Sequence, residues 1–273
     1  MKEYSFLTSV YKNTKRGEME ETVSSMLAQT VAPKRIVIVI DGPIPDDLKE
    51  YVDGLKEKDP ELFTVAPIEN NVGLGEALRV GTDFCETELI ARMDTDDICL
   101  PDRCEKEIEC FEKDESLSVV GSFIAEFIGS PENVVSERKV PEKHEEIVAF
   151  MKKRCPFNHV SVMMKKSELV RAGGYLTWHY DEDSYLWARM YLAGCKFKNI
   201  PENLVLVRID ENMFKRRGGY KYYKSQKKLF RFMKDNKIIG RFAYFKAKAV
   251  RFTVYVLMPN FLRQWFFMKF ARK

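Results

Sequence analysis

The first half of the chain alternates between short apolar runs and amphipathic stretches. Residues Arg35–Ile40 form a continuous β-branched run, which is typical of a parallel strand buried on both faces. Residues Glu18–Gln29 instead repeat apolar side chains at helical spacing. The same reasoning predicts further strands at 4–11, 62–68 and 89–93, and further helices at 46–58 and 74–85. This alternation predicts an α/β fold with a mostly parallel central sheet flanked by helices.

Beyond Phe111 the pattern is less regular, although the same kinds of element recur. Strands are predicted at 117–127, 158–164 and 203–209, and helices at 142–153, at 183–193, just before Gly173-Gly174 and after Gly219. A chain of 273 residues fits one large domain with a small appendage. We therefore expect one domain built from two halves, residues 1–110 and 111–211, followed by a basic helical tail at 212–273.

Three carboxylates follow the apolar run Leu89–Ala91 within a few residues. Asp94, Asp96 and Asp97 repel one another unless a positive group lies among them. Divalent cations such as Mg²⁺ and Mn²⁺ take carboxylate oxygens together with substrate phosphates. Because open α/β sheets bind ligands at the carboxyl ends of their strands, the pattern favours a metal-diphosphate site. The alternative is a solvated acidic turn in which Asp97 caps the next helix.

The charge of the chain is distributed unevenly. Residues 212–273 carry 18 Lys or Arg and one acidic residue, a net charge near +17, whereas the remainder is near −13. This asymmetry indicates an anionic partner for the tail. The six cysteines show neither a CxxC pair nor zinc-ligand spacing, so we expect reduced thiols and a cytoplasmic protein. No apolar run approaches the ~20 residues needed to span a bilayer.

Several ordered motifs carry a resemblance to a known family. They are Asp41-Gly42, Asn71-x-Gly73-Leu74, Arg92-Met93-Asp94-x-Asp96-Asp97, Pro101-x-Arg103, Gly173-Gly174-Tyr175 and Glu182–Arg189. In this order they resemble the family 2 inverting glycosyltransferases, which have the A-type fold. The segments Asn203–Arg208 and Arg216–Gly219 resemble the subgroup that builds bacterial capsular and exopolysaccharides. The resemblance covers residues 4–220, and the chain departs from the family pattern at Ser9, Ile40 and Arg79.

The resemblance implies a UDP-sugar donor, a Mn²⁺ or Mg²⁺ cofactor and a saccharide or lipid-linked acceptor. Asp94 would lie towards the ribose and the metal, and Asp96 would coordinate the metal that bridges the phosphates. Asp41 would accept from a uracil N–H, and Asp183 would be the catalytic base, with Glu182 beside it. The nucleotide-binding set that it implies is Ser9, Tyr11, Asp41, Asn71, Gly73, Arg92, Asp94, Arg216 and Arg217.

Plainer interpretations of these residues stay open. An alternative role for Asp41 is that of a turn residue before a glycine. An alternative role for Asp183 and its acidic neighbours is to stabilise a helix N-terminus by their negative charge. Asp97 is expected to cap a helix or to support the metal ligands. Arg103 is expected to form an ordinary salt bridge rather than to pair with the acidic residues, and His159 to be structural or to line the acceptor or diphosphate pocket.

The tail interleaves aromatic residues with Lys and Arg. This pattern favours an amphipathic helix on an anionic membrane, with packing against the body as the alternative. A lipid-linked acceptor makes the membrane interpretation coherent, and the protein would then be peripheral on the inner face of a bacterial plasma membrane. The competing functions are a nucleotidyltransferase and a non-enzymatic membrane-binding or nucleic-acid-binding protein. The stretch Ser5–Lys15 lacks the glycines of a triphosphate loop, and the acidic body argues against nucleic acid.

Overall fold

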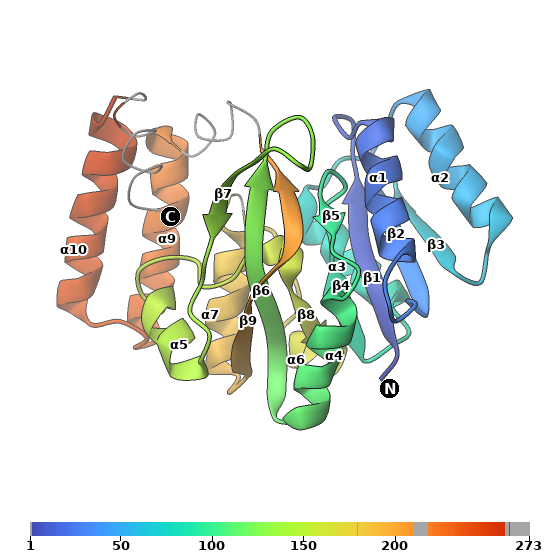
Figure 1. The fold of residues 1–273 in the computed structure, drawn as a ribbon. Helices are drawn as coiled ribbons and strands as arrows, with labels where there is room; N and C mark the ends of the chain where they lie inside the picture. The colour runs from blue at the N-terminus through green and yellow to red at the C-terminus, as the bar shows by residue number, and fades with distance from the viewer. Residues whose placement is uncertain (1, 179, 210–217, 260–261, 263–273) are drawn as a thin grey trace.

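The computed structural model describes residues 2–178, 180–209, 218–259 and 262. A strand-helix alternation builds its N-terminal half (Figure 1). The elements are β1 (Tyr4–Val10), α1 (Arg16–Leu27), β2 (Arg35–Asp41), α2 (Asp46–Lys58), β3 (Phe63–Ile68), α3 (Leu74–Phe84) and β4 (Leu89–Arg92). All seven were predicted, and their bounds agree with the sequence pattern to within two residues.

The C-terminal half contains shorter strands and more turns. Its elements are β5 (Ile98–Cys99), α4 (Arg103–Lys113), β6 (Leu117–Phe127), β7 (Val134–Arg138), α5 (His144–Met151), η1 (His159–Ser161), β8 (Met163–Lys165), α6 (Lys166–Arg171), α7 (Glu182–Leu192), β9 (Lys196–Arg208), α9 (Gly219–Asp235), α10 (Arg241–Phe252) and the π-helical turn η2 (Thr253–Leu257). The predicted strand at 203–209 is the second part of the longer β9. The strands β5 and β7 were not predicted.

The predicted strand at 158–164 is wrong over its first residues. Ser161 donates its backbone N–H to the carbonyl of Asn158 at 2.9 Å, which closes the 3₁₀ turn η1. The Asn158 amide nitrogen also donates to the Ser122 carbonyl of β6 at 2.8 Å. These two bonds hold the chain in a turn, so that only residues 163–165 pair as β8. The apolar composition of this segment reflects burial rather than an extended backbone.

Within the described residues one sheet runs through both halves, in the order β3-β2-β1-β4-β8-β6-β9-β5, with β7 paired to β6. The strands β3, β2, β1 and β4 are parallel, as is the pair β6–β9. β8 lies antiparallel between β4 and β6. The chain order therefore reverses between β1 and β4, and the carboxyl ends of these two strands border the crevice in which open α/β sheets bind ligands.

The central strands of the sheet are buried on both faces. One apolar cluster packs around Phe6, Ile36 and Ile38 with helices α1, α2 and α4, and the other packs around Leu7 and Val37 with α3, α5, α6 and α7. Alternate residues of β1 and β2 face opposite clusters, as the period of a strand requires. Burial on both faces of the sheet thus explains the continuous apolar run of β2, as its composition predicts.

The described part of the tail packs on the body. Helices α9 and α10 lie side by side at the end of the molecule remote from α2 (Figure 1). Leu229, Phe230 and Met233 of α9 are buried in the same apolar cluster as α7, and Tyr244 of α10 joins them. The helical prediction is confirmed here, and the packing alternative holds for these residues. Among the described residues, no helix is long and apolar enough to cross a membrane.

Candidate active site

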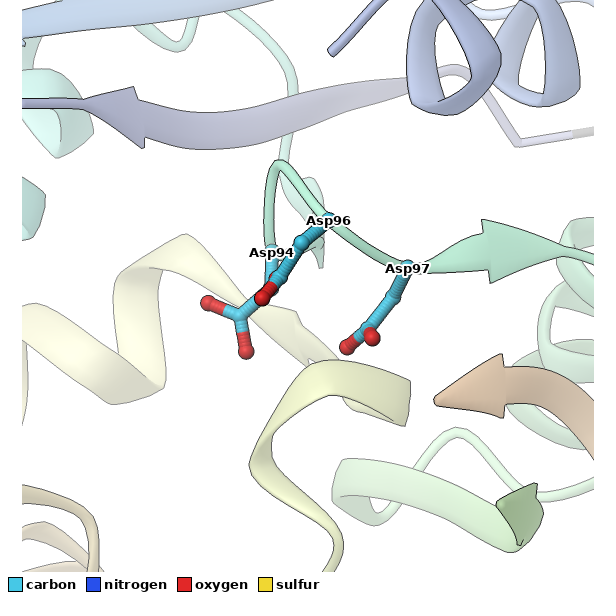
Figure 2. Close-up of side chains that lie close together, drawn as sticks. All are labelled: Asp94, Asp96 and Asp97. Carbon is cyan, nitrogen blue, oxygen red and sulfur yellow. The ribbon is translucent and has the colours of Figure 1, made fainter. Parts of the chain in front are cut away.

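The acidic loop directly follows β4, at the switch point of the sheet. Asp94, Asp96 and Asp97 each offer a carboxylate oxygen, and these oxygens lie within 4.8 Å of one another. Figure 2 shows the three side chains along a single turn of the chain between β4 and β5. Asp97 is buried, whereas Asp94 and Asp96 are open to solvent to different degrees. A group of two accessible carboxylates above a buried one is a donor set that suits a hard divalent cation.

The electrostatics of the loop favour a bound cation. The loss of surrounding water in the loop, followed by the charge of Asp94, raises the pKa of Asp96 to about 6, although this side chain still reaches solvent. Burial, followed by Asp96 and Asp94, raises the pKa of Asp97 well above its ordinary value. Arg92 is buried and forms an ion pair with Asp94. Burial disfavours the protonated guanidinium of Arg92, but Asp94 outweighs this effect, so the pKa of Arg92 is raised. One buried arginine offsets one of three carboxylates, and the remaining negative charge suits Mn²⁺ or Mg²⁺.

Asp97 does not cap a helix, so that interpretation is wrong. Its Oδ1 accepts the backbone N–H of Arg208 at 2.8 Å, across 111 residues. Its backbone carbonyl accepts the hydroxyl of Thr22 at 2.8 Å, while α4 begins only at Arg103. The Arg208 guanidinium also donates to the carbonyl of Asp96 at 3.2 Å. Asp97 and Arg208 therefore fix the acidic loop between α1 and the end of β9.

Arg103 forms the expected ordinary salt bridge. It pairs with Glu107 one turn along α4 at 3.3 Å, and both side chains are fully buried. It also donates to the carbonyl of Arg92 at 2.9 Å and to that of Val162 at 3.3 Å. Arg103 thus holds the end of β4 beneath the acidic loop without contacting the carboxylates of that loop.

Asp41 organises the loop between β3 and α3. Its carboxylate accepts the Asn71 amide at 2.9 Å and the backbone N–H groups of Val72 and Gly73 at 2.7 and 3.0 Å. Only glycine fits at position 42, because a Cβ there would lie 2.5 Å from the Asn71 nitrogen. Asp41 is therefore more than a turn residue: it holds Asn71 and Gly73 in place at the carboxyl end of β2.

The end of β1 supplies the neighbouring wall. Ser9 is half-buried, and Tyr11 is 41% exposed just beyond the strand. Among the described residues, the buried Thr8 hydroxyl and the Arg92 Nε have no hydrogen-bond partner. Both belong to the strands that flank the switch point, where a polar ligand would satisfy them. The predicted ligands Arg216 and Arg217 lie outside the described residues.

The candidate base Asp183 lies in the first turn of α7. Its Oδ1 accepts the Ser184 backbone N–H at 2.6 Å, and its Oδ2 accepts the Cys155 thiol at 3.1 Å. Burial, followed by Asp183, raises the pKa of the adjacent Glu182 to about 7. Burial likewise raises the pKa of Asp181 to about 7, although Ser225 and Gln226 of α9 donate to it. The three acidic residues therefore differ in environment, and among the described residues only Asp181 is hydrogen-bonded to the tail.

An aromatic cluster of the second half packs against this helix. Trp187 of α7 is buried against Phe157 at 4.9 Å and His159 at 5.9 Å between ring centroids. The Nε2 of His159 is 2.9 Å from the Tyr175 hydroxyl. Burial, followed by the nearby Arg92 charge, lowers the pKa of His159 well below its ordinary value. His159 is therefore neutral near pH 7 and bonded to Tyr175, which favours the structural interpretation.

Sequence reasoning missed three contacts around the site. Cys155 contacts Asp183, Arg208 holds the acidic loop, and Asp181 connects α7 to α9. Arg208, the one basic residue in the apolar segment 203–209, is a weak signal for the second of these. The partners of the other two lie 28 and 44 residues away, so no local spacing indicates them.

An acidic loop at the switch point of an α/β sheet, with an acidic helix N-terminus in the second half, fits the class of A-type glycosyltransferases. The chain belongs to glycosyl transferase family 2, whose sequence profile matches residues 5–172. It is therefore an enzyme, and the nucleotidyltransferase and the non-enzymatic interpretations are set aside.

Curated relatives match almost the whole chain. An uncharacterized glycosyltransferase of Haemophilus influenzae is 35% identical over 99% of each chain. The amylovoran biosynthesis glycosyltransferase AmsE of Erwinia amylovora is 33% identical over 97% of this chain and 98% of its own. A UDP-Gal:alpha-D-GlcNAc-diphosphoundecaprenol beta-1,3-galactosyltransferase of Escherichia coli is 32% identical over 99% of this chain and 97% of its own. Relatives of this chain thus act in the biosynthesis of bacterial polysaccharides.

Solved structures share the fold. TarS of S. aureus in complex with UDP-GlcNAc has a TM-score of 0.67 at 16% identity, over 93% of this chain and 73% of that chain. The mannosyltransferase PcManGT from Pyrobaculum calidifontis in complex with GDP-Man and Mn²⁺ has a TM-score of 0.63 at 14% identity, over 91% of this chain and 68% of that chain. At these identities the likeness establishes the A-type fold alone.

Proposed function

We propose that the protein transfers a sugar from a UDP-sugar to a lipid-linked saccharide, with inversion, in the biosynthesis of a cell-surface polysaccharide. The observation that carries this proposal is the acidic loop at the switch point, with Asp94 and Asp96 within reach of one cation. The UDP-GlcNAc bound by TarS and the diphosphoundecaprenol named for the Escherichia coli relative support the donor and acceptor classes. Residues 1–110 form the donor half and residues 111–211 the acceptor half of one domain.

The donor half would bind the nucleotide diphosphate. Asp94 and Asp96 would hold a Mn²⁺ or Mg²⁺ ion, which supplies neutralisation of the charge that builds on the leaving diphosphate. Arg92 orients Asp94 through their ion pair. Asp41 fixes the loop of Asn71 and Gly73 beside the base pocket, where Ser9 and Tyr11 form the opposite wall. Arg216 and Arg217 complete the proposed phosphate-binding set.

The acceptor half would supply the base. The acceptor hydroxyl attacks the anomeric carbon of the donor, its proton passes to the carboxylate of Asp183, and the bond to UDP breaks on the opposite face. A thiol and a backbone N–H already orient this carboxylate. Burial raises the pKa of Glu182 beside it, so Glu182 carries less charge near pH 7 than an exposed glutamate. Asp183, oriented by these two bonds, would therefore be the acceptor of the proton.

The aromatic and basic tail supports a peripheral position on the inner face of a bacterial plasma membrane. Phe242 and Phe245 of α10 are 83% and 60% exposed, next to Arg241 and Lys246. Exposed aromatic rings among basic residues suit the surface of an anionic bilayer. Co-sedimentation with vesicles that contain anionic lipid should fall for the double variant Phe242→Ser and Phe245→Ser. A matched control variant replaces the exposed Val134 and Val135 of β7, also by serine, and should bind the vesicles as the wild-type protein does. An equal loss of vesicle binding in both variants would refute the membrane role.

A donor screen tests the reaction itself. UDP-glucose, UDP-galactose and their N-acetyl forms are mixed with the protein and Mn²⁺ in the presence of lipid-linked acceptor, and UDP release and product are measured. Asp96→Ala should abolish transfer and weaken UDP binding, because the diphosphate loses its bridging cation. Glu105→Ala, in the first turn of α4, is a matched control that leaves the loop intact. Full activity of Asp96→Ala in excess EDTA would refute the proposal.

A further inference from the structure

A pocket of about 250 Å³ lies between the segment before α7 and the first turns of α9. Trp178 and Tyr180 line it from the segment, and Lys221, Lys224 and Lys228 line it from the helix. None of these residues belongs to the acidic loop or to the donor half. The pocket thus lies on the acceptor half of the chain and has no assigned role.

The lysines give the pocket an uncompensated positive charge. Spacings of three and four residues place Lys221, Lys224 and Lys228 on one face of α9. All three are exposed, and no ion pair with a carboxylate engages them in the part of the chain that the structure describes. The ammonium of Lys228 lies 4.0 Å from the centre of the Trp178 ring. Three ammonium groups around a cavity, without acidic partners, attract a multiply charged anion.

The aromatic wall is fixed in place. The Trp178 indole is buried, donates to the Ser225 hydroxyl at 3.1 Å and packs on Tyr185 of α7 with ring centroids 4.0 Å apart. Tyr180 has a φ of +77°, which is strained for a residue other than glycine. Such strain persists only where the surroundings enforce it, and it gathers at ligand clamps. A rigid aromatic wall that faces a few charged groups is typical of a small-molecule site.

A chain of hydrogen bonds joins the pocket to the candidate base. The Ser225 hydroxyl that accepts from Trp178 donates in turn to Asp181. Asp181 directly precedes α7, and Asp183 lies in the first turn of that helix. The pocket is therefore tied by hydrogen bonds to the start of the helix that carries the candidate base.

We propose that this pocket binds the diphosphate of the acceptor, with the attached saccharide extending from the aromatic wall towards Asp183. The inference rests on the proposed function, because it requires an acceptor carried on a diphosphate. A neutral saccharide would leave the charge of the three lysines unneutralised, whereas a diphosphate ester offers several charged oxygens for charge-assisted hydrogen bonds. An anionic lipid headgroup shares this phosphate chemistry, so the test separates the two sources.

The test compares two full-length triple variants of equal charge. The pocket variant combines Lys221→Ala, Lys224→Ala and Lys228→Ala, and the control variant combines Lys58→Ala, Lys227→Ala and Lys248→Ala, which lie in α2, α9 and α10 outside the pocket. Two soluble acceptors are used: GlcNAc-diphosphate on a short alkyl chain, and the alkyl glycoside of GlcNAc without the diphosphate. Unchanged UDP affinity establishes that both variants are folded.

In the pocket variant, the KM for the diphosphate acceptor should rise by roughly ten- to a hundredfold, the loss expected for charge-assisted hydrogen bonds. The donor KM should stay the same, and the preference for the diphosphate acceptor over the plain glycoside should disappear. The control variant should behave as wild type. Single Lys224→Gln should show a smaller change in the same direction.

Equal acceptor KM values in the pocket and control variants would overturn the inference. So would loss of binding to anionic vesicles in the pocket variant alone with an unchanged acceptor KM, which would assign the pocket to a lipid headgroup. If the wild-type protein transfers no sugar from any UDP-sugar, the proposed function fails. Calorimetric titration of the diphosphate acceptor into the wild-type and pocket-variant proteins, saturated with UDP, then decides the pocket by itself.

Discussion

The substitution Asp183→Asn separates proton transfer from donor binding. The carboxylate of Asp183 accepts two hydrogen bonds, from the Ser184 backbone N–H at 2.6 Å and from the Cys155 thiol at 3.1 Å. An asparagine keeps a carbonyl oxygen for the Ser184 amide, but its NH₂ group cannot accept from the thiol. The loss is one weak hydrogen bond, about 1 kcal/mol or less, so the fold should survive.

The effect on turnover should be far larger than the effect on stability. A positioned base contributes about 10²- to 10⁴-fold, and at 1.36 kcal/mol for each factor of ten this is about 3–5.5 kcal/mol on the barrier. The amide of asparagine cannot take the acceptor's proton. UDP affinity should stay within about twofold of wild type, a change of under 0.5 kcal/mol, because the acidic loop lies after β4 in the other half of the chain.

The assay measures kcat by UDP release in the presence of acceptor, and UDP affinity by calorimetry with Mn²⁺. Cys155→Ala is the matched control, since it removes the same thiol contact and leaves the carboxylate intact. A variant that binds UDP but turns over slowly, beside an active Cys155→Ala, supports the base. Near-normal turnover of Asp183→Asn would refute the reasoning and move the role to Glu182, whereas loss of UDP binding would refute the division into donor and acceptor halves.

Three further changes test the structure around the site. Burial raises the pKa of Asp181 from 3.8 to about 7, so the folded chain holds a proton that the unfolded chain releases. The free energy of unfolding should therefore fall by about 4 kcal/mol between about pH 4 and pH 8. Urea unfolding across this pH range should show that Asp181→Asn removes the fall. Glu107→Gln leaves the fully buried Arg103 without its carboxylate partner and should lower the free energy of unfolding by about 3–5 kcal/mol. Glu109→Gln, in the exposed ion pair of the same helix, should cost far less, and equal losses would contradict the prediction. Gly75→Ala brings a Cβ to 2.9 Å from the Leu176 carbonyl and should lower kcat by displacing the segment before α7, while Gly54→Ala, where nothing lies within 4 Å, should not.

The sequence by itself determined the N-terminal half of the fold. The continuous β-branched run of β2 predicts a strand buried on both faces, and apolar spacing predicts α1, because these patterns depend only on neighbouring residues. The acidic loop was equally local, since three carboxylates after one strand share a turn wherever that strand lies. The Arg103–Glu107 salt bridge follows from a spacing of four residues on a helix.

Only the tertiary structure decided the partners of the candidate site residues. Asp97 bonds Arg208 across 111 residues, and Asp183 meets Cys155 across 28. The apolar segment at 158–164 was misassigned for the same reason: the bond from Asn158 to β6 holds it in a turn. Such contacts are set by the order and register of strands in the sheet and by how the helices dock on it. Periodicity along the chain carries no information about them, because it reports which face of an element is buried and not what covers that face.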